Sequence, residues 1–188
     1  MFRRLRLQFI MIASLAILFI LVFTVGIINT VRSFQTEQEI SKVLNTLTEN
    51  NGSFGKTKKI ETNQGREIPS DSFRFFSVTL SDDKIVSQDT SHTSLINDEE
   101  AARYALTVSR LTNNLGTIRE KNINLSYQVS KVSKDKILVV FLDTTSYYNS
   151  SQALLSLSIL LSLFGFIFFV VIVSALSGIV IRPFIRNY

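Results

Sequence analysis

Two long apolar stretches separated by a polar middle organise the hydrophobic pattern of this chain. Residues 7–31 form 25 consecutive positions without a charged side chain, and residues 144–181 form 38 more. About 20 mostly apolar residues suffice for a helix to cross the roughly 30 Å hydrocarbon core of a bilayer. The pattern predicts transmembrane helices at residues 7–31 and 153–181. The first is expected to be an uncleaved signal anchor, because no small-residue cleavage site follows it.

The polar middle, residues 32–152, carries the pattern of a folded domain. Ile40, Val43, Leu44 and Leu47 recur at helical spacing, which predicts an amphipathic helix that continues from the first span and ends at residues 50–52. Residues 52–70 are polar and contain three glycines, and we expect a mobile, irregular connection there.

Two β-hairpins and one further helix are predicted after this connection. Residues 73–80 and 84–87 are rich in β-formers around a polar turn, and residues 123–129 and 137–142 form a second pair around another turn. Between the pairs, Asn97 and Glu100 have capping-box spacing at the start of a helical pattern. This order predicts an α+β domain whose four-stranded, mostly antiparallel, PAS-like sheet carries packed helix on one face.

The charges set the expected orientation in a membrane. All 15 Asp and Glu residues lie between the two apolar runs, whereas the +5 net charge resides on the flanks, in Arg3, Arg4, Arg6, Arg182 and Arg186. By the positive-inside rule, residues 1–6 and 182–188 are cytoplasmic and residues 32–152 are extracytoplasmic. The excess of basic residues therefore indicates the orientation of the chain in the membrane, and we expect membrane lipid rather than nucleic acid as a partner. The chain has no cysteine, which excludes disulfides and thiolate metal sites.

The sequence predicts no catalytic, cofactor-binding or metal-binding residue. His92 lies in a polar loop without a partner pattern, and the acids at residues 98–100 match the preference for negative charge at a helix start. The lysines at residues 56–59 are expected to be solvated. Arg74, which stands among phenylalanines at the start of a predicted strand, is the candidate for contact with a ligand or partner.

Four segments together resemble the input half of Gram-positive two-component sensor histidine kinases. They are residues 1–7 (MFRRLRL), 74–78 (RFFSV), 141–143 (FLD) and 181–188 (IRPFIRNY). The resemblance implies a bacterial cell-membrane protein that acts as a homodimer and senses an unknown extracytoplasmic ligand or membrane partner. It also implies a cytoplasmic kinase region, missing from these residues, that uses ATP and Mg²⁺ and transfers phosphate to a response regulator.

In this interpretation Arg182 and Pro183 transmit the signal, because proline breaks the backbone ladder where the span passes into the cytoplasmic segment. The short cytoplasmic segment after the second span favours a truncated protein. Two alternatives remain open. One is an input module with a methyl-accepting or cyclic-dinucleotide output, and the other is a structural two-span subunit of an envelope complex.

Overall fold

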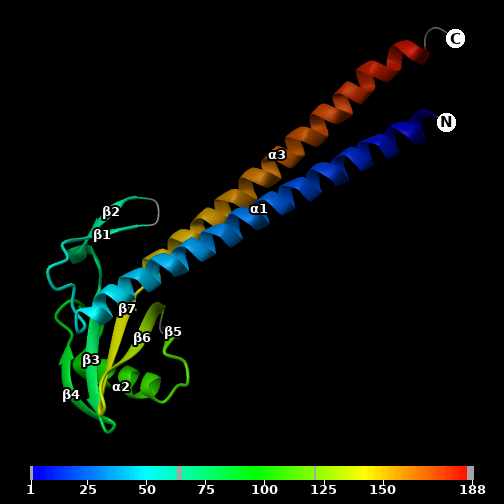
Figure 1. The fold of residues 1–188 in the computed structure, drawn as a ribbon. Helices are drawn as coiled ribbons and strands as arrows, with labels where there is room; N and C mark the ends of the chain where they lie inside the picture. The colour runs from blue at the N-terminus through cyan, green and yellow to red at the C-terminus, as the bar shows by residue number, and fades with distance from the viewer. Residues whose placement is uncertain (1, 63–64, 121, 186–188) are drawn as a thin grey trace. The chain divides into compact units, whose positions relative to one another are not determined.

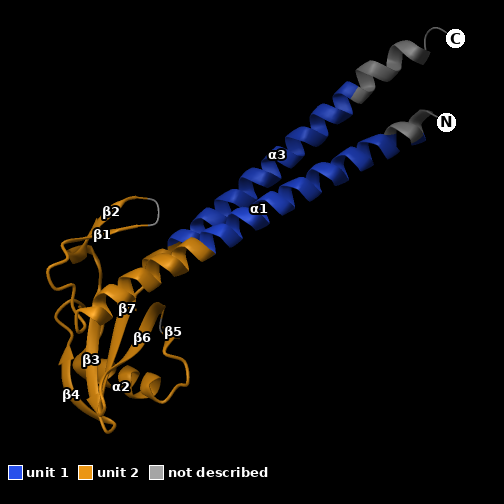
Figure 2. Ribbon diagram, in the orientation of Figure 1, with its two compact units in different colours: residues 1–33, 150–188 blue, residues 34–149 orange. Residues whose placement is uncertain are grey.

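The computed structural model describes residues 2–62, 65–120 and 122–185, except for the side chains of residues 2, 3, 5, 6 and 177–185. The chain is divided into two compact units, shown in Figure 2. Unit 1 comprises Met1–Ser33 and Ser150–Tyr188, and unit 2 comprises Phe34–Asn149.

Unit 1 is made of two apolar helical segments. They belong to α1 (Phe2–Glu49) and α3 (Thr145–Ile185), which are both long and apolar enough to cross a membrane. None of the side chains described in unit 1 is buried, and large residues such as Phe19 (72% exposed) and Leu161 (71% exposed) are open to the surroundings. An apolar surface this extensive is uncommon on a monomer in water and marks a lipid or protein contact.

Unit 2 is built on a five-stranded antiparallel sheet with the order β4-β3-β7-β6-β5 (Figure 1). Its strands are β3 (Phe75–Ser81), β4 (Lys84–Asp89), β5 (Leu115–Glu120), β6 (Ile123–Ser133) and β7 (Lys136–Asp143). The two predicted hairpins are present as β3–β4 and β6–β7. The β3–β4 turn is formed by Asp82 and Asp83, both with positive φ, which matches the twist of paired strands.

The prediction of four strands was wrong, because β5 was missed. Its residues alternate between exposed and half-buried, so the segment lacks the apolar pattern from which a strand is recognised. β5 is an edge strand that pairs with β6 alone. Asn113 and Asn114 lead directly into this strand, which itself contains Gly116.

Helices cover both faces of the sheet, whereas the sequence predicted helix on one face. On one face lies α2 (Asp98–Ser109), which begins with the predicted capping box between Asn97 and Glu100. The other face is covered by the end of α1. The core on the α2 side contains Phe76, Val78, Leu80, Ile96, Ala101, Tyr104, Ala105, Val108, Leu125, Tyr127, Val139 and Phe141. The core on the α1 side contains Ile40, Val43, Leu44, Leu47, Phe54, Ile60, Phe73, Phe75, Leu138, Val140 and Leu142.

The predicted apolar stripe of α1 is therefore confirmed as a core element. Leu44 and Leu47 have no exposed surface. The helix ends where the sequence predicts, and Gly52 closes it by donating its backbone N–H to the carbonyl of Leu47 at 2.7 Å. Gly52 has φ +86°, and a Cβ there would lie 2.4 Å from the Ser77 hydroxyl, so any larger residue would clash with β3.

The segment predicted to be irregular contains a small second sheet. β1 (Lys59–Glu61) and β2 (Glu67–Pro69) pair antiparallel and are followed by a short 3-10 helix, η1 (Ser70–Ser72). Strands of three residues give almost no periodic signal, so the sequence could not reveal them. Ile60 anchors this hairpin in the core on the α1 side.

The core role of α1 leads to a stability prediction. We expect Leu44→Ala to lower the free energy of unfolding of the sheet domain by about 2–5 kcal/mol, because it leaves a cavity in a fully buried site. Glu37→Ala, on the exposed side of the same helix, should change it by less than about 0.5 kcal/mol. Denaturant unfolding of the micelle-solubilised chain, followed by near-ultraviolet circular dichroism, measures both values. Equal effects of the two variants would show that α1 is not part of this core.

Candidate functional site

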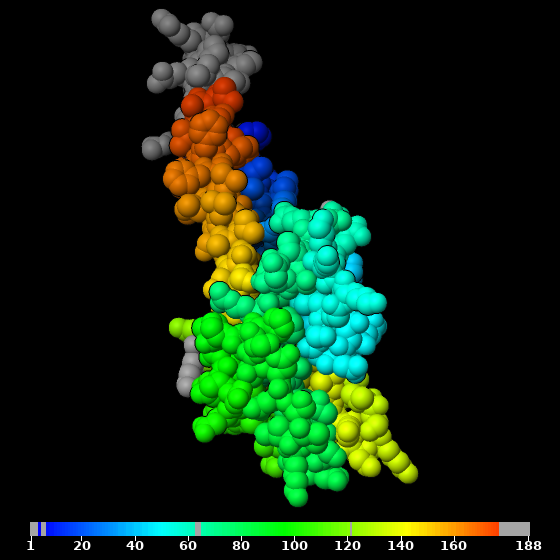
Figure 3. All heavy atoms as spheres, turned by 90° about the vertical axis from the view of Figure 1, so that its left-hand side faces the viewer, coloured from blue at the N-terminus to red at the C-terminus, as the bar shows by residue number. Residues whose placement is uncertain are grey.

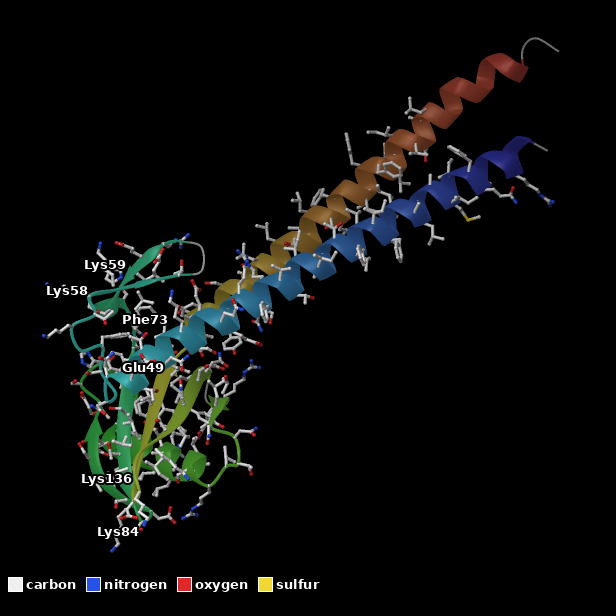
Figure 4. The ribbon with its side chains drawn as sticks, in the orientation of Figure 1. Glu49, Lys58, Lys59, Phe73, Lys84 and Lys136 are labelled. Carbon is white, nitrogen blue, oxygen red and sulfur yellow. The ribbon has the colours of Figure 1, made fainter. Side chains whose placement is uncertain are left out.

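One end of the five-stranded sheet gathers several separate segments of unit 2. Because β3, β7 and β6 are antiparallel neighbours, the start of β3, the end of β7 and the start of β6 meet at this end. α3 also begins here, two residues after β7. Figure 4 shows Phe73 at this end of the sheet and Lys84 and Lys136 at the other, where the hairpin turns lie. Figure 3 shows these turns projecting at the far end of the domain.

The gathered segments line a cleft of about 600 Å³. Binding sites for small molecules usually enclose about 300–1,000 Å³. The lining comes from β2, η1, the residues before β3 and α2, the β5–β6 turn, the end of β7 and the first turns of α3. The residues are Ile68, Ser72, Phe73, Arg74, Leu95, Asn122, Ile123, Asp143, Thr145, Ser146, Tyr147 and Asn149. The cleft, called the Arg74 cleft below, thus lies entirely within unit 2.

Arg74, the sequence-predicted contact residue, is the basic side chain among the described residues that line this cleft. The residue is exposed, and its backbone carbonyl accepts a hydrogen bond from the Asp143 N–H at 2.9 Å. Within the described part of the chain, neither Arg74 nor Asp143 takes part in an ion pair. Two opposite charges therefore stand just before β3 and at the end of β7, in one cleft, without forming an ion pair with each other.

A hydrogen-bond network with a buried centre at Thr144 joins the sheet to α3. Thr144, which is completely buried, donates its N–H to the carbonyl of Asn124 at 2.8 Å, and its hydroxyl donates to the same oxygen at 3.1 Å. The hydroxyls of Thr144 and Ser126 are 3.0 Å apart, and that of Ser126 lies 3.1 Å from Thr117 on β5. Three strands are thus tied to one residue at the strand–helix joint.

The first turn of α3 is held by two further contacts. Asp143 accepts a hydrogen bond from the Thr145 N–H through Oδ1 at 2.9 Å, which satisfies a donor that has no partner within the helix. The Thr145 hydroxyl in turn accepts from the Asn124 N–H at 2.9 Å, and the Asn124 side chain accepts from Arg119 Nε at 2.8 Å. The residues of this network, called the α3 joint below, are Thr117, Arg119, Asn124, Ser126, Asp143, Thr144 and Thr145.

Sequence reasoning singled out Arg74 but missed the α3 joint. A signal was present, because Asp143, Thr144 and Thr145 are all types favoured at helix N-caps and stand directly before an apolar helix. The sequence did not indicate their partners, Asn124 and Ser126. These residues reach the start of α3 only through the register of the sheet, which no local sequence pattern reveals. The helix α3 runs through Arg182 and Pro183, whose side chains lie outside the described residues, so their role in transmission stays a prediction.

The other residues considered in the sequence analysis make contacts that stabilise the fold. His92 is exposed, and its ring stacks on Phe75 with the ring centres 4.5 Å apart. The pKa of the nearby Asp89 is lowered, chiefly because its carboxylate accepts hydrogen bonds from the Ser91 hydroxyl and backbone. Lys59 forms an ion pair with Glu67 across the β1–β2 hairpin. The described residues contain no group of three or more His, Asp or Glu side chains placed to hold a metal ion.

A second polar cluster lies on α2, away from the cleft. The Arg103 guanidinium is 3.3 Å from the Glu120 carboxylate and 5.0 Å from the centre of the Tyr104 ring. Burial raises the pKa of Tyr104, and its hydrogen bond to Glu120 raises it further. These contacts fasten α2 to the edge strand β5, and their role is structural.

Comparison with known proteins supplies no family for the chain. A scan of the sequence against protein-family models finds no match, and a search of curated proteins finds no relative. The functional interpretation therefore rests on the fold, the Arg74 cleft and the α3 joint.

The buried network predicts a specific cost for removing one hydroxyl. We expect Thr144→Val, which preserves shape, to lower the free energy of unfolding by about 1–3 kcal/mol, because it removes the two buried hydrogen bonds of the Thr144 hydroxyl. The same change at the exposed Thr107, whose hydroxyl bonds within its own helix, should cost less than about 0.5 kcal/mol. Hydrogen exchange should also show loss of protection at the Thr144 amide in Thr144→Val alone. Identical behaviour of both variants would contradict the network.

Proposed function

We propose that this chain is the membrane-bound input module of a two-component sensor histidine kinase. In this proposal the sheet domain detects an extracytoplasmic stimulus, and two transmembrane helices carry the response to a cytoplasmic kinase region. That region lies outside these residues, uses ATP and Mg²⁺ and phosphorylates a response regulator. The module works as a homodimer in the bacterial cell membrane with both termini cytoplasmic.

The observation that carries the proposal is the way both apolar helices are built into the folded domain. At one connection, α1 is continuous from Phe2 to Glu49, and its last turns supply fully buried core residues such as Leu44. At the other connection, α3 starts next to Thr144, which is hydrogen-bonded to the neighbouring strand β6. Among the described residues, α1 therefore runs without interruption into the core, and α3 begins just after β7. In this proposal a change in domain packing acts on the helices through these two connections.

The exposed apolar surface of unit 1 supports insertion in a membrane. The candidate spans, Leu7–Glu49 and Thr145–Leu176, contain windows with a mean hydropathy of 2.9 whose side chains are not buried by the rest of the protein. Lipid is the environment in which such windows are stable, and the arginines at both ends of the chain favour cytoplasmic termini.

The strand order of the sheet domain supports the proposal of a PAS-like sensor. Its first and last strands, β3 and β7, lie side by side in the centre, and each belongs to a hairpin that extends the sheet outward. The connection between the hairpins carries α2 across one face, as in PAS-like folds. The long preceding helix packs on the other face. This arrangement leaves the start of β3 and the end of β7 open for the Arg74 cleft.

Helix shifts of about 1–2 Å are enough to change the state of a packed helical protein. A small rearrangement at the α3 joint is therefore sufficient as a signal, provided that the two arrangements differ in affinity for the stimulus.

The topology is testable with single cysteines, because the natural chain has none. We expect Lys134→Cys, in the β6–β7 turn, to react with a membrane-impermeant maleimide in intact bacterial cells. Arg4→Cys should react only after the cells are opened. Labelling is read by a mass shift on gels. The opposite pattern would place the sheet domain in the cytoplasm and would end the proposal of an extracytoplasmic sensor.

Signal transmission is testable in a fusion protein. The chain is joined after Tyr188 to the phosphoacceptor and ATP-binding half of a histidine kinase with a transcriptional reporter. We expect Thr144→Val to change basal output severalfold, because about 1 kcal/mol shifts a two-state equilibrium about fivefold. Thr107→Val is the matched control and should leave output unchanged. Output that is insensitive to both variants, and also to replacement of residues 34–149 by a glycine-serine linker, would favour a structural subunit instead.

A further inference from the structure

We propose that the Arg74 cleft binds a small zwitterion that carries one carboxylate and one ammonium group, a free amino acid or a short peptide. This inference rests on the proposed function, since it names the ligand class of the same input module. It is derived from the charges, the neutral polar groups and the size of the cleft.

The arrangement of charge favours a ligand with both signs. Arg74, just before β3, and Asp143, at the end of β7, are joined by a backbone hydrogen bond, and both line the cleft. An arginine presents a planar fork of N–H donors that matches the two oxygens of a carboxylate. A carboxylate such as that of Asp143 accepts several hydrogen bonds, and its Oδ1 has one from Thr145. Asp143 can therefore also accept from an ammonium group.

The same pair of residues argues against other classes of ligand. A phosphate-rich or otherwise strongly anionic molecule requires several cations, whereas the described lining contains one arginine and no lysine. Such a ligand would also be repelled by Asp143. A simple metal ion would be repelled by Arg74. A zwitterion places each of its charges against the opposite sign and keeps the total charge of the site unchanged.

Neutral and apolar lining completes the match. Asn122, Ser146 and Asn149 offer hydrogen-bond donors and acceptors around the charged pair. Phe73, Leu95 and Ile123 supply an apolar wall, and Leu95 remains 47% exposed. The wall is suited to the side chain of an amino acid, because burying apolar atoms there removes them from water. A cleft of about 600 Å³ has room for one amino acid or a short peptide.

The α3 joint makes such a ligand relevant to signalling. Asp143 and Thr145 belong both to the cleft lining and to the joint, through the hydrogen bond from the Thr145 N–H to Asp143 Oδ1. An ammonium group bound by Asp143 shares the carboxylate that holds this backbone donor, and it draws on the same negative charge. Ligand binding thus acts on the first turn of α3 without any intermediate element.

Binding is tested on residues 1–188 in lipid nanodiscs by isothermal titration calorimetry. The probes are the twenty free amino acids and a set of alanyl dipeptides, which distinguish the two sources of the zwitterion. For the tightest probe, the analogue without the amino group and the analogue without the carboxylate follow. We expect each analogue to bind at least tenfold more weakly. No binding of any probe at millimolar concentration, or equal binding of the carboxylate-only analogue, would overturn the proposal.

Three variants test whether the ligand binds in the Arg74 cleft and distinguish the contributions of the two charged residues. Arg74→Gln should abolish binding, and Asp143→Asn should lower the affinity for the zwitterion to that of its carboxylate-only analogue. Asparagine keeps the side-chain oxygen that caps Thr145, so the fold is preserved, which circular dichroism verifies. Arg110→Gln, an exposed arginine outside the cleft, should bind as the natural chain does. If Arg74→Gln and Arg110→Gln bind equally well, the cleft is not the site.

The binding experiment involves no kinase and no membrane orientation. A failure there would remove the ligand class and leave the input-module proposal to the labelling and fusion experiments. Conversely, a bound zwitterion together with an unresponsive fusion protein would retain the site and refute its role in transmission.

Discussion

The packing of β7 against both neighbouring strands and both helical layers is the interaction on which the rest of the structure depends. Residues 138–142 of this strand are all buried, and they alternate between the core on the α2 side and the core on the α1 side. A strand covered on both faces is apolar throughout, which explains its continuous run of hydrophobic residues. Because β7 is central and leads directly into α3, the most strongly fixed element of the domain is also the one joined to an apolar helix.

The two helical connections differ in their physical character. α1 is held by apolar contacts of residues such as Leu44, which are nondirectional and tolerate small sliding movements. The start of α3 is held by directed hydrogen bonds around Thr144, which require defined distances and break when the groups separate. A displacement of the sheet relative to the helices therefore costs little at α1 at first but is felt at once at the α3 joint. In the proposed sensor, this asymmetry favours α3 as the helix that carries the signal.

The sequence predicted those parts of the fold whose residues interact with near neighbours in the chain. The capping box of Asn97, the stripe of α1 and the turn at Asp82 all follow from local spacing, and the structure contains each of them. The strand β5 and the β1–β2 hairpin were missed because short or edge strands are defined by their partners rather than by their own pattern. Arg74 was found because a charged residue among phenylalanines is conspicuous. Its cleft depends on strand order, which no local pattern contains.

In the proposed sensor, the α3 joint and the Arg74 cleft together limit how strong a signal the domain can generate. A ligand shifts an equilibrium only by its difference in affinity for the two states, and coupling between sites in proteins is typically 1–3 kcal/mol. Rearranging one charge-assisted hydrogen bond at Asp143 is worth about 1.5–3 kcal/mol, which is the same range. One contact at the start of α3 is thus enough to account for a response of about ten- to a hundredfold. The proposed mechanism needs no larger rearrangement, and the buried hydrogen bonds of Thr144 hold the start of α3 on the sheet.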